Sequence, residues 1–176
     1  MPGSRFLIES QVLTTSAASV TFSSIPATYT DLVLKYSSRH NNAFSISQSA
    51  ITFNGSSAAN YSETVLYGTS TVAASGRQSG SSQIDFMYDD ADSATANTFS
   101  NTELYIPNYR VSANKPMSWF GVTENNATTN NSALIVANAS LWRDNSAITS
   151  ITILALASRN FLAGSSFYLY GISSTV

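Results

Sequence analysis

His40 is the only histidine of the chain and the first residue whose chemistry could be catalytic. Any Ser-His-Asp arrangement would have to use it, because a triad needs an imidazole between nucleophile and carboxylate. It lies in a polar stretch, residues 38–42, and the chain contains no Gly-x-Ser-x-Gly nucleophile motif. We therefore expect a solvated loop histidine, and we expect His40→Ala to leave folding and assembly intact. We assign no catalytic residue.

Carboxylates are the other candidates for chemistry. Asp85, Asp89, Asp90 and Asp92 form the one local concentration of acidic residues. Calcium takes about six to eight oxygen ligands, and this segment lacks the glycine and closing glutamate of an EF-hand loop. A solvated loop is the expectation, with a structural calcium site as the alternative. One histidine and no cysteine leave too few ligands for zinc. We assign no metal and no cofactor.

Four glutamates could supply paired carboxylates for sugar hydrolysis, which needs two of them about 5 to 9 Å apart. Nothing in their spacing singles out a pair, so a glycosidase is a weak alternative. The residues are Glu9, Glu63, Glu103 and Glu124.

Tyr168 and Tyr170 flank Leu169 and share one face of an expected strand. Such a pair could stack on a sugar, or it could pack against a neighbouring strand or subunit. The run 167–172 is apolar on both faces, whereas a strand at an exposed sheet face alternates with polar residues. A loop of the same chain or a second subunit should cover the second face. We assign Tyr168 and Tyr170 to an oligomer interface, in a trimer.

The composition narrows the class of protein. Charged residues make up only 10% of the 176 residues, against about 25% in a typical domain. The chain instead holds 32 Ser, 18 Thr and 15 Asn. A net charge of −2 and scattered basic residues argue against nucleic-acid binding. No apolar run approaches the roughly 18 residues that span a membrane. The length predicts a single domain over residues 1–176.

Short apolar runs separated by Ser, Asn and Gly predict the elements that would position these residues. Eight to eleven such runs recur at fairly regular spacing, and long helical patterns are missing. This predicts an all-β fold, an antiparallel β-sandwich. Asn54-Gly55 predicts a tight turn, and residues 68–82 and 125–132 are expected to be loops. Short helical turns are possible at 92–96 or 138–141. The expected strands cover 6–13, 20–22, 31–36, 50–53, 64–67, 83–88, 102–106, 117–124, 134–142, 148–156 and 167–172.

Several of these segments, in their order along the chain, resemble a family of virion structural proteins of tailed phages. The similarity extends over nearly the whole chain, and the segments that carry it lie at 6–11, 18–26, 29–34, 51–55, 96–99, 104–109, 148–153 and 164–172. The resemblance implies a jelly-roll-like sandwich, a place on the virion after assembly in the cytoplasm of a bacterial host, and no catalytic residues.

Two functions follow from the resemblance. The first is a capsid decoration (cement) protein that oligomerises and binds the major capsid protein. The second is a tail or fibre component with a receptor- or glycan-binding β-sandwich. Because the given chain begins at the domain, without a shaft or coiled coil, we expect the first. A carbohydrate-active enzyme or an unrelated binding module remains as a further alternative.

Overall fold

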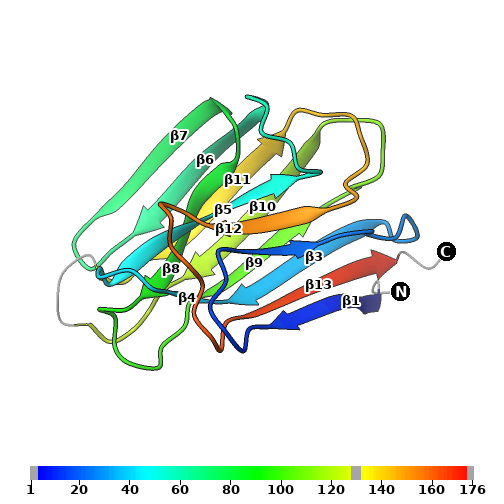
Figure 1. The fold of residues 1–176 in the computed structure, drawn as a ribbon. Helices are drawn as coiled ribbons and strands as arrows, with labels where there is room; N and C mark the ends of the chain where they lie inside the picture. The colour runs from blue at the N-terminus through cyan, green and yellow to red at the C-terminus, as the bar shows by residue number, and fades with distance from the viewer. Residues whose placement is uncertain (1–3, 128–131, 174–176) are drawn as a thin grey trace.

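The computed structural model describes residues 4–127 and 132–173, which form two β-sheets packed face to face (Figure 1). The part of the chain that it describes contains no helix. All strand pairs are antiparallel except the short pair of β4 with β8. The predicted antiparallel all-β sandwich is therefore confirmed.

The strand order defines the two layers. The larger sheet has eight strands in the order β1 (Ser4–Val12), β13 (Ser166–Ser173), β3 (Asp31–Ser37), β9 (Asn101–Ile106), β10 (Lys115–Val122), β11 (Ile135–Trp142), β6 (Tyr61–Gly68) and β7 (Ala73–Ser81). The smaller sheet has five, in the order β2 (Ser19–Phe22), β12 (Ile151–Ala155), β5 (Ile46–Phe53), β8 (Ile84–Ala91) and β4 (Arg39–His40).

Burial alternates along the strands most clearly in β10 and β11. In β10, the residues from Lys115 to Gly121 at odd positions are buried, and those from Pro116 to Phe120 at even positions are exposed. Strand β11 follows the same pattern. Because successive side chains of a strand point to opposite faces, one set fills the space between the sheets and the other forms an outward face.

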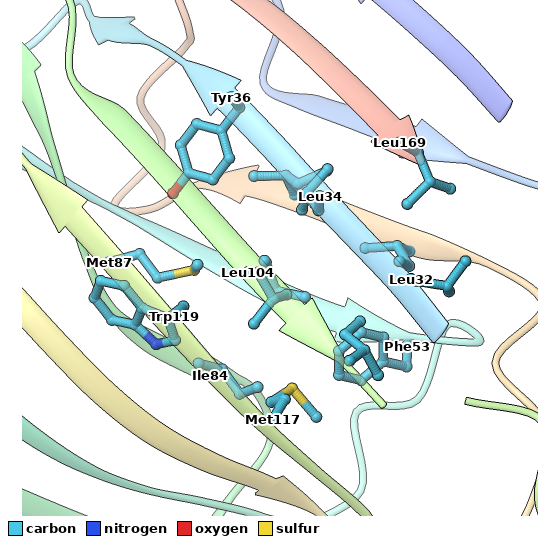
Figure 2. Close-up of a cluster of buried hydrophobic side chains, with 14 of the residues drawn as sticks. Leu32, Leu34, Tyr36, Phe53, Ile84, Met87, Leu104, Met117, Trp119 and Leu169 are labelled. Atoms are coloured by element: carbon cyan, nitrogen blue, oxygen red, sulfur yellow. The ribbon is translucent and has the colours of Figure 1, made fainter. Parts of the chain in front are cut away.

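The core lies between the sheets and takes side chains from both. Figure 2 shows the contribution of β3, β9, β10 and β13 from one layer and of β5 and β8 from the other. Tyr61 and Trp142 stack with their ring centroids 6.2 Å apart, and Phe53 contacts both rings from the opposite sheet. Burial of this apolar and aromatic area is the dominant favourable term in folding.

Turn signals in the sequence lie where strands end. Strand β2 ends before Pro26, and β9 ends at the residue before Pro107. At Asn54-Gly55 both residues have positive φ, 53° and 66°, and the Ser56 amide donates to the Phe53 carbonyl at 2.9 Å. This closes the predicted tight turn, after which the chain leaves the smaller sheet and enters the larger one at β6.

Three expectations from the sequence are wrong. Residues 73–81, expected in a loop, form the edge strand β7, which pairs through its backbone with β6. Residues 138–141 lie inside β11, and residues 92–96 form bends and turns rather than a helix. In the expected loop 125–132, residues 128–131 lie outside the described residues.

Gly171 provides a test of the packing between β13 and the segment before β3. A Cβ added there would lie 2.2 Å from the ring of Tyr29. We expect Gly171→Ala to lower the free energy of unfolding by about 1–3 kcal/mol, because the ring must shift from a packed position. Urea denaturation measures the change. Gly76→Ala is the control, because its Cβ would meet the Val65 side chain at 3.3 Å and the Phe86 ring at 3.7 Å, without a comparable clash. An equal loss in both variants would contradict the packing shown here.

Candidate functional site

The outward face of the eight-stranded sheet is the surface on which apolar side chains are exposed. Here "outward face" means the side of this sheet turned away from the five-stranded sheet. The strand register aligns two rows of outward residues across it. One row is Leu7, Tyr170, Val33, Tyr105, Ser118, Ala139, Thr64 and Arg77. The other is Ser10, Tyr168, Lys35, Glu103, Phe120, Ala137, Leu66 and Ser75.

Tyr168 and Tyr170 lie on this outward face, and both are partly buried. Their neighbours Phe167 and Leu169 point into the core and are completely buried. Val33, between Tyr170 and Tyr105 in the register, is also 0% exposed although it faces outward. Val33 on β3 is therefore covered, whereas the two tyrosines of β13 keep part of their surface accessible.

Leu7 is 54% exposed beside Tyr170, and Val12 is 58% exposed at the end of the same edge strand. We call Leu7, Val12, Tyr168 and Tyr170 the tyrosine patch. At the opposite edge, Leu66 is 63% and Ile135 53% exposed. They line a hollow of about 550 Å³ together with Ala73 and Ala137. We call these four residues the apolar patch.

A second hollow lies between the two patches. Phe120, which is 50% exposed, separates it from the apolar patch and lines both. This groove measures about 500 Å³, and its other outward side chains are Lys35, Asn101, Glu103, Tyr105, Ser118 and Ala137. Ser118 and Ala137 are short and stand beside the longer Phe120 and Tyr105 in the register. The difference in side-chain length hollows an otherwise continuous sheet.

Ionic and hydrogen-bonded contacts hold the walls of this groove. Lys35 Nζ lies 2.6 Å from Glu103 Oε2, and Arg5 lies 3.7 Å from the other oxygen of the same carboxylate. The hydroxyl of Tyr105 donates to Asp31 at 2.8 Å. Partial burial raises the pKa of Tyr105, and the hydrogen bond to Asp31 and its charge raise it further. The Tyr105 hydroxyl therefore stays protonated and in place at neutral pH.

His40 lies elsewhere, and its expected place in a solvated loop is wrong. It forms strand β4, where the chain passes from β3 in the larger sheet to the smaller sheet, and it is 0% exposed. Its ring meets Phe161 edge-on with centroids 4.8 Å apart. Its Nε2 lies 3.2 Å from both Asp89 Oδ2 and Ser49 Oγ.

Asp89 is the centre of this buried network. Its Oδ1 accepts hydrogen bonds from Ser38 at 2.6 Å and Ser100 at 2.7 Å, and its Oδ2 accepts a short one from Ser49. Burial alone would raise the pKa of the Asp89 carboxyl. The hydrogen bond from His40, its positive charge when protonated, and the hydrogen bonds from the hydroxyls of Ser38 and Ser49 outweigh that effect and lower the pKa.

The structure thus brings a serine, a histidine and an aspartate together, but not as a catalytic triad. In a triad the two ring nitrogens contact different partners. Here both contacts use Nε2, and Nδ1 has no hydrogen-bond partner among the described residues. His40, Ser49 and Asp89 are each 0% exposed. The network instead joins β4, β5 and β8 to the start of β9.

The acidic cluster is likewise not a solvated loop. Asp85, Asp89 and Asp90 lie on β8, and the last two are 0% exposed. Burial raises the pKa of Asp90, whose Oδ1 accepts a hydrogen bond from Asn125 at 3.0 Å. Asp92 is exposed, and its backbone carbonyl accepts from the guanidinium of Arg39. Among residues 4–127 and 132–173, no three His, Asp or Glu side chains are grouped so that they could hold a metal ion.

Of the four glutamates, Glu63 and Glu103 lie on opposite faces of the larger sheet. Glu103 faces outward, whereas Glu63 on β6 faces the core and is 3% exposed. Glu63 accepts hydrogen bonds from Gln78 at 2.5 Å and from Asn138 at 2.8 Å. Gln78 also donates to Asp85 at 2.6 Å. Burial raises the pKa of Glu63 against these hydrogen bonds. The contacts attach the edge strand β7 to the sandwich.

His40→Ala tests the role of the network. We now expect this change to destabilise the fold by about 3–5 kcal/mol, because it removes one partner of a buried carboxylate. Arg77→Ala, at an exposed position of β7, is the control. Urea denaturation at pH 7 measures the loss, and a change below about 1 kcal/mol in His40→Ala would contradict the account.

The destabilisation caused by His40→Ala should depend on pH. In the wild type the lowered pKa of Asp89 contributes stability above its unfolded value of about 3.9, and this is lost as the pH falls through the folded pKa. Without His40, we expect burial to outweigh the remaining hydrogen bonds from Ser38 and Ser49 and to raise the pKa of Asp89. Protonation of Asp89 at acid pH should then reduce the destabilisation of the variant. The difference in unfolding free energy between the two proteins should therefore shrink from pH 7 to pH 4. A difference that grows towards acid pH would be the opposite of this expectation.

The described part of the chain contains no helix that could cross a membrane. In comparisons with known proteins, no family model, no curated protein and no solved structure matches this chain.

Proposed function

We propose that this chain is a non-enzymatic structural protein of a bacteriophage particle. Its role is that of a capsid decoration protein that binds the capsid surface and oligomerises through the two patches on the outward face of its larger sheet. The observation that carries the proposal is that this face exposes two surfaces rich in apolar side chains, the tyrosine patch and the apolar patch. A sheet face turned to water normally carries polar residues, and exposed apolar clusters mark protein contacts.

The order of the strands supports the fold expected for such a protein. The block β1-β13-β3-β9 lies in one sheet and the block β2-β12-β5-β8 in the other. Strands β1, β2 and β3 alternate between the sheets, as do β9, β12 and β13. We infer from this order a jelly roll, which has eight strands in two Greek keys. Strands β10, β11, β6 and β7 then widen one sheet, and the widened part carries the apolar patch.

The low charge of the outward face also supports assembly. Each charge removed from water in an interface costs free energy unless it is paired. The tyrosine patch and the apolar patch contain no charged residue. The charges between them include Lys35 and Glu103, which are already paired at 2.6 Å. Tyrosine is enriched at protein interfaces because its ring packs and its hydroxyl finds a partner.

The positions of the patches favour a ring. The tyrosine patch lies at the β1 edge of the sheet and the apolar patch near the β7 edge. A contact between different patches on successive chains is head-to-tail, and such contacts form a ring when the rotation from one chain to the next closes. A homotrimer in which the tyrosine patch of one chain meets the apolar patch of the next fits this arrangement.

We expect the double change Tyr168→Ser, Tyr170→Ser to weaken association more than it weakens the fold. Both side chains are only partly buried on the outward face, so their loss should lower the melting temperature much less than the loss of a core residue would. Light scattering at micromolar concentration measures the oligomer, and thermal melts measure the fold. A wild-type chain that is monomeric under these conditions and does not sediment with capsids would contradict the proposal.

A mixing experiment tests the head-to-tail arrangement. The double change Leu66→Ser, Ile135→Ser disrupts only the apolar patch, and the tyrosine double variant disrupts only the tyrosine patch. Because a head-to-tail contact needs both patches, each of these two variants should be monomeric by itself. Mixed, the two variants retain one intact contact and should form a one-to-one dimer that cannot grow. If the Leu66, Ile135 variant still self-associates as the wild type does, the contact joins identical tyrosine patches and the head-to-tail arrangement is wrong.

A further inference from the structure

We propose that the groove between the two patches binds a neutral saccharide. The inference goes beyond assembly, because the groove lies between the patches and its polar side chains belong to neither. Its volume of about 500 Å³ is within the range of small-molecule sites, about 300–1,000 Å³.

The groove offers apolar aromatic walls. Tyr105 is 37% and Phe120 50% exposed, and they lie on the adjacent strands β9 and β10 with Ser118 directly beside Tyr105. Ser118 and Ala137 leave space next to these rings. A pyranose ring has a face of C–H groups that can lie against an aromatic ring, and burying that face removes apolar surface from water.

The groove also offers hydrogen-bonding groups that suit hydroxyls. Each sugar hydroxyl both donates and accepts. Glu103 can accept, Lys35 can donate, and Asn101 and Ser118 can do both. The contact of Lys35 with Glu103 at 2.6 Å holds the two side chains in place before any ligand arrives. Holding groups in their bound position lowers the entropic cost of binding.

Charge argues for a neutral ligand. The groove contains one positive and one negative side chain, and their fields largely cancel at a separation of 2.6 Å. A strongly anionic or cationic ligand would gain little there. Because the pair is about 40% exposed on each side chain, it contributes little to stability and is free to contact a ligand.

Saturation-transfer NMR on the wild-type chain tests the inference. The probes are neutral trisaccharides of glucose, galactose, mannose and N-acetylglucosamine, with sialyllactose and spermine as charged comparisons. We expect at least one neutral trisaccharide to bind in the millimolar range or tighter, and more strongly than either charged probe. Two results would overturn the inference. One is that no neutral probe binds at 10 mM, which is tenfold above a dissociation constant of about 1 mM. The other is that a charged probe binds more strongly than every neutral probe.

Variants locate the site. Tyr105→Ala and Phe120→Ala should each weaken binding about tenfold, and Glu103→Gln should weaken it while leaving the aromatic walls intact. All three positions face solvent, and thermal melts check their folding. Leu66→Ser, in the apolar patch, should leave saccharide binding unchanged even where it reduces assembly. Binding that is insensitive to all three groove variants would place the saccharide elsewhere and contradict the inference, without affecting the proposed role in assembly.

Discussion

The alternation of side chains along each strand is the constraint on which the other features depend. Once inward positions such as Trp119 and Leu169 fill the core, the residues between them must face outward. The outward residues are then free of the demands of core packing. In a sheet of eight strands they form a broad surface, and here that surface carries leucine, isoleucine, phenylalanine and tyrosine. The proposed functions use this outward surface, whereas the inward residues stabilise the fold.

The interior has its own polar requirement where the chain crosses between the sheets. The step from β3 to β4 takes Ser38, Arg39 and His40 inside, and a buried polar group without a partner is costly. Asp89 and Ser100 bind Ser38, and backbone carbonyls at 92, 94, 95 and 98 surround the guanidinium of Arg39. A serine, a histidine and an aspartate therefore meet for a structural reason, because the crossing needs them to satisfy one another.

The sequence predicted the elements whose signal is local. Alternating apolar runs located eleven of the thirteen strands, and Asn54-Gly55 located a turn. Strand β7 was not predicted because its residues are small and polar, and it is held by backbone pairing and by Gln78. The network around Asp89 was not predicted because its partners lie up to 51 residues away in the sequence. The groove was not predicted for the same reason, since Lys35, Glu103 and Phe120 become neighbours only through the strand order.

The central claim is that the tyrosine patch and the apolar patch on the outward face of the larger sheet contact other chains in the particle. A cryo-EM map of the intact particle, with this chain located in it, tests this most directly. The account predicts that Tyr168 and Tyr170 on one side, and Leu66 and Ile135 on the other, lie against neighbouring protein chains, with like chains around a threefold axis. A map in which both patches are open to solvent and the chain is held by other surfaces would contradict it.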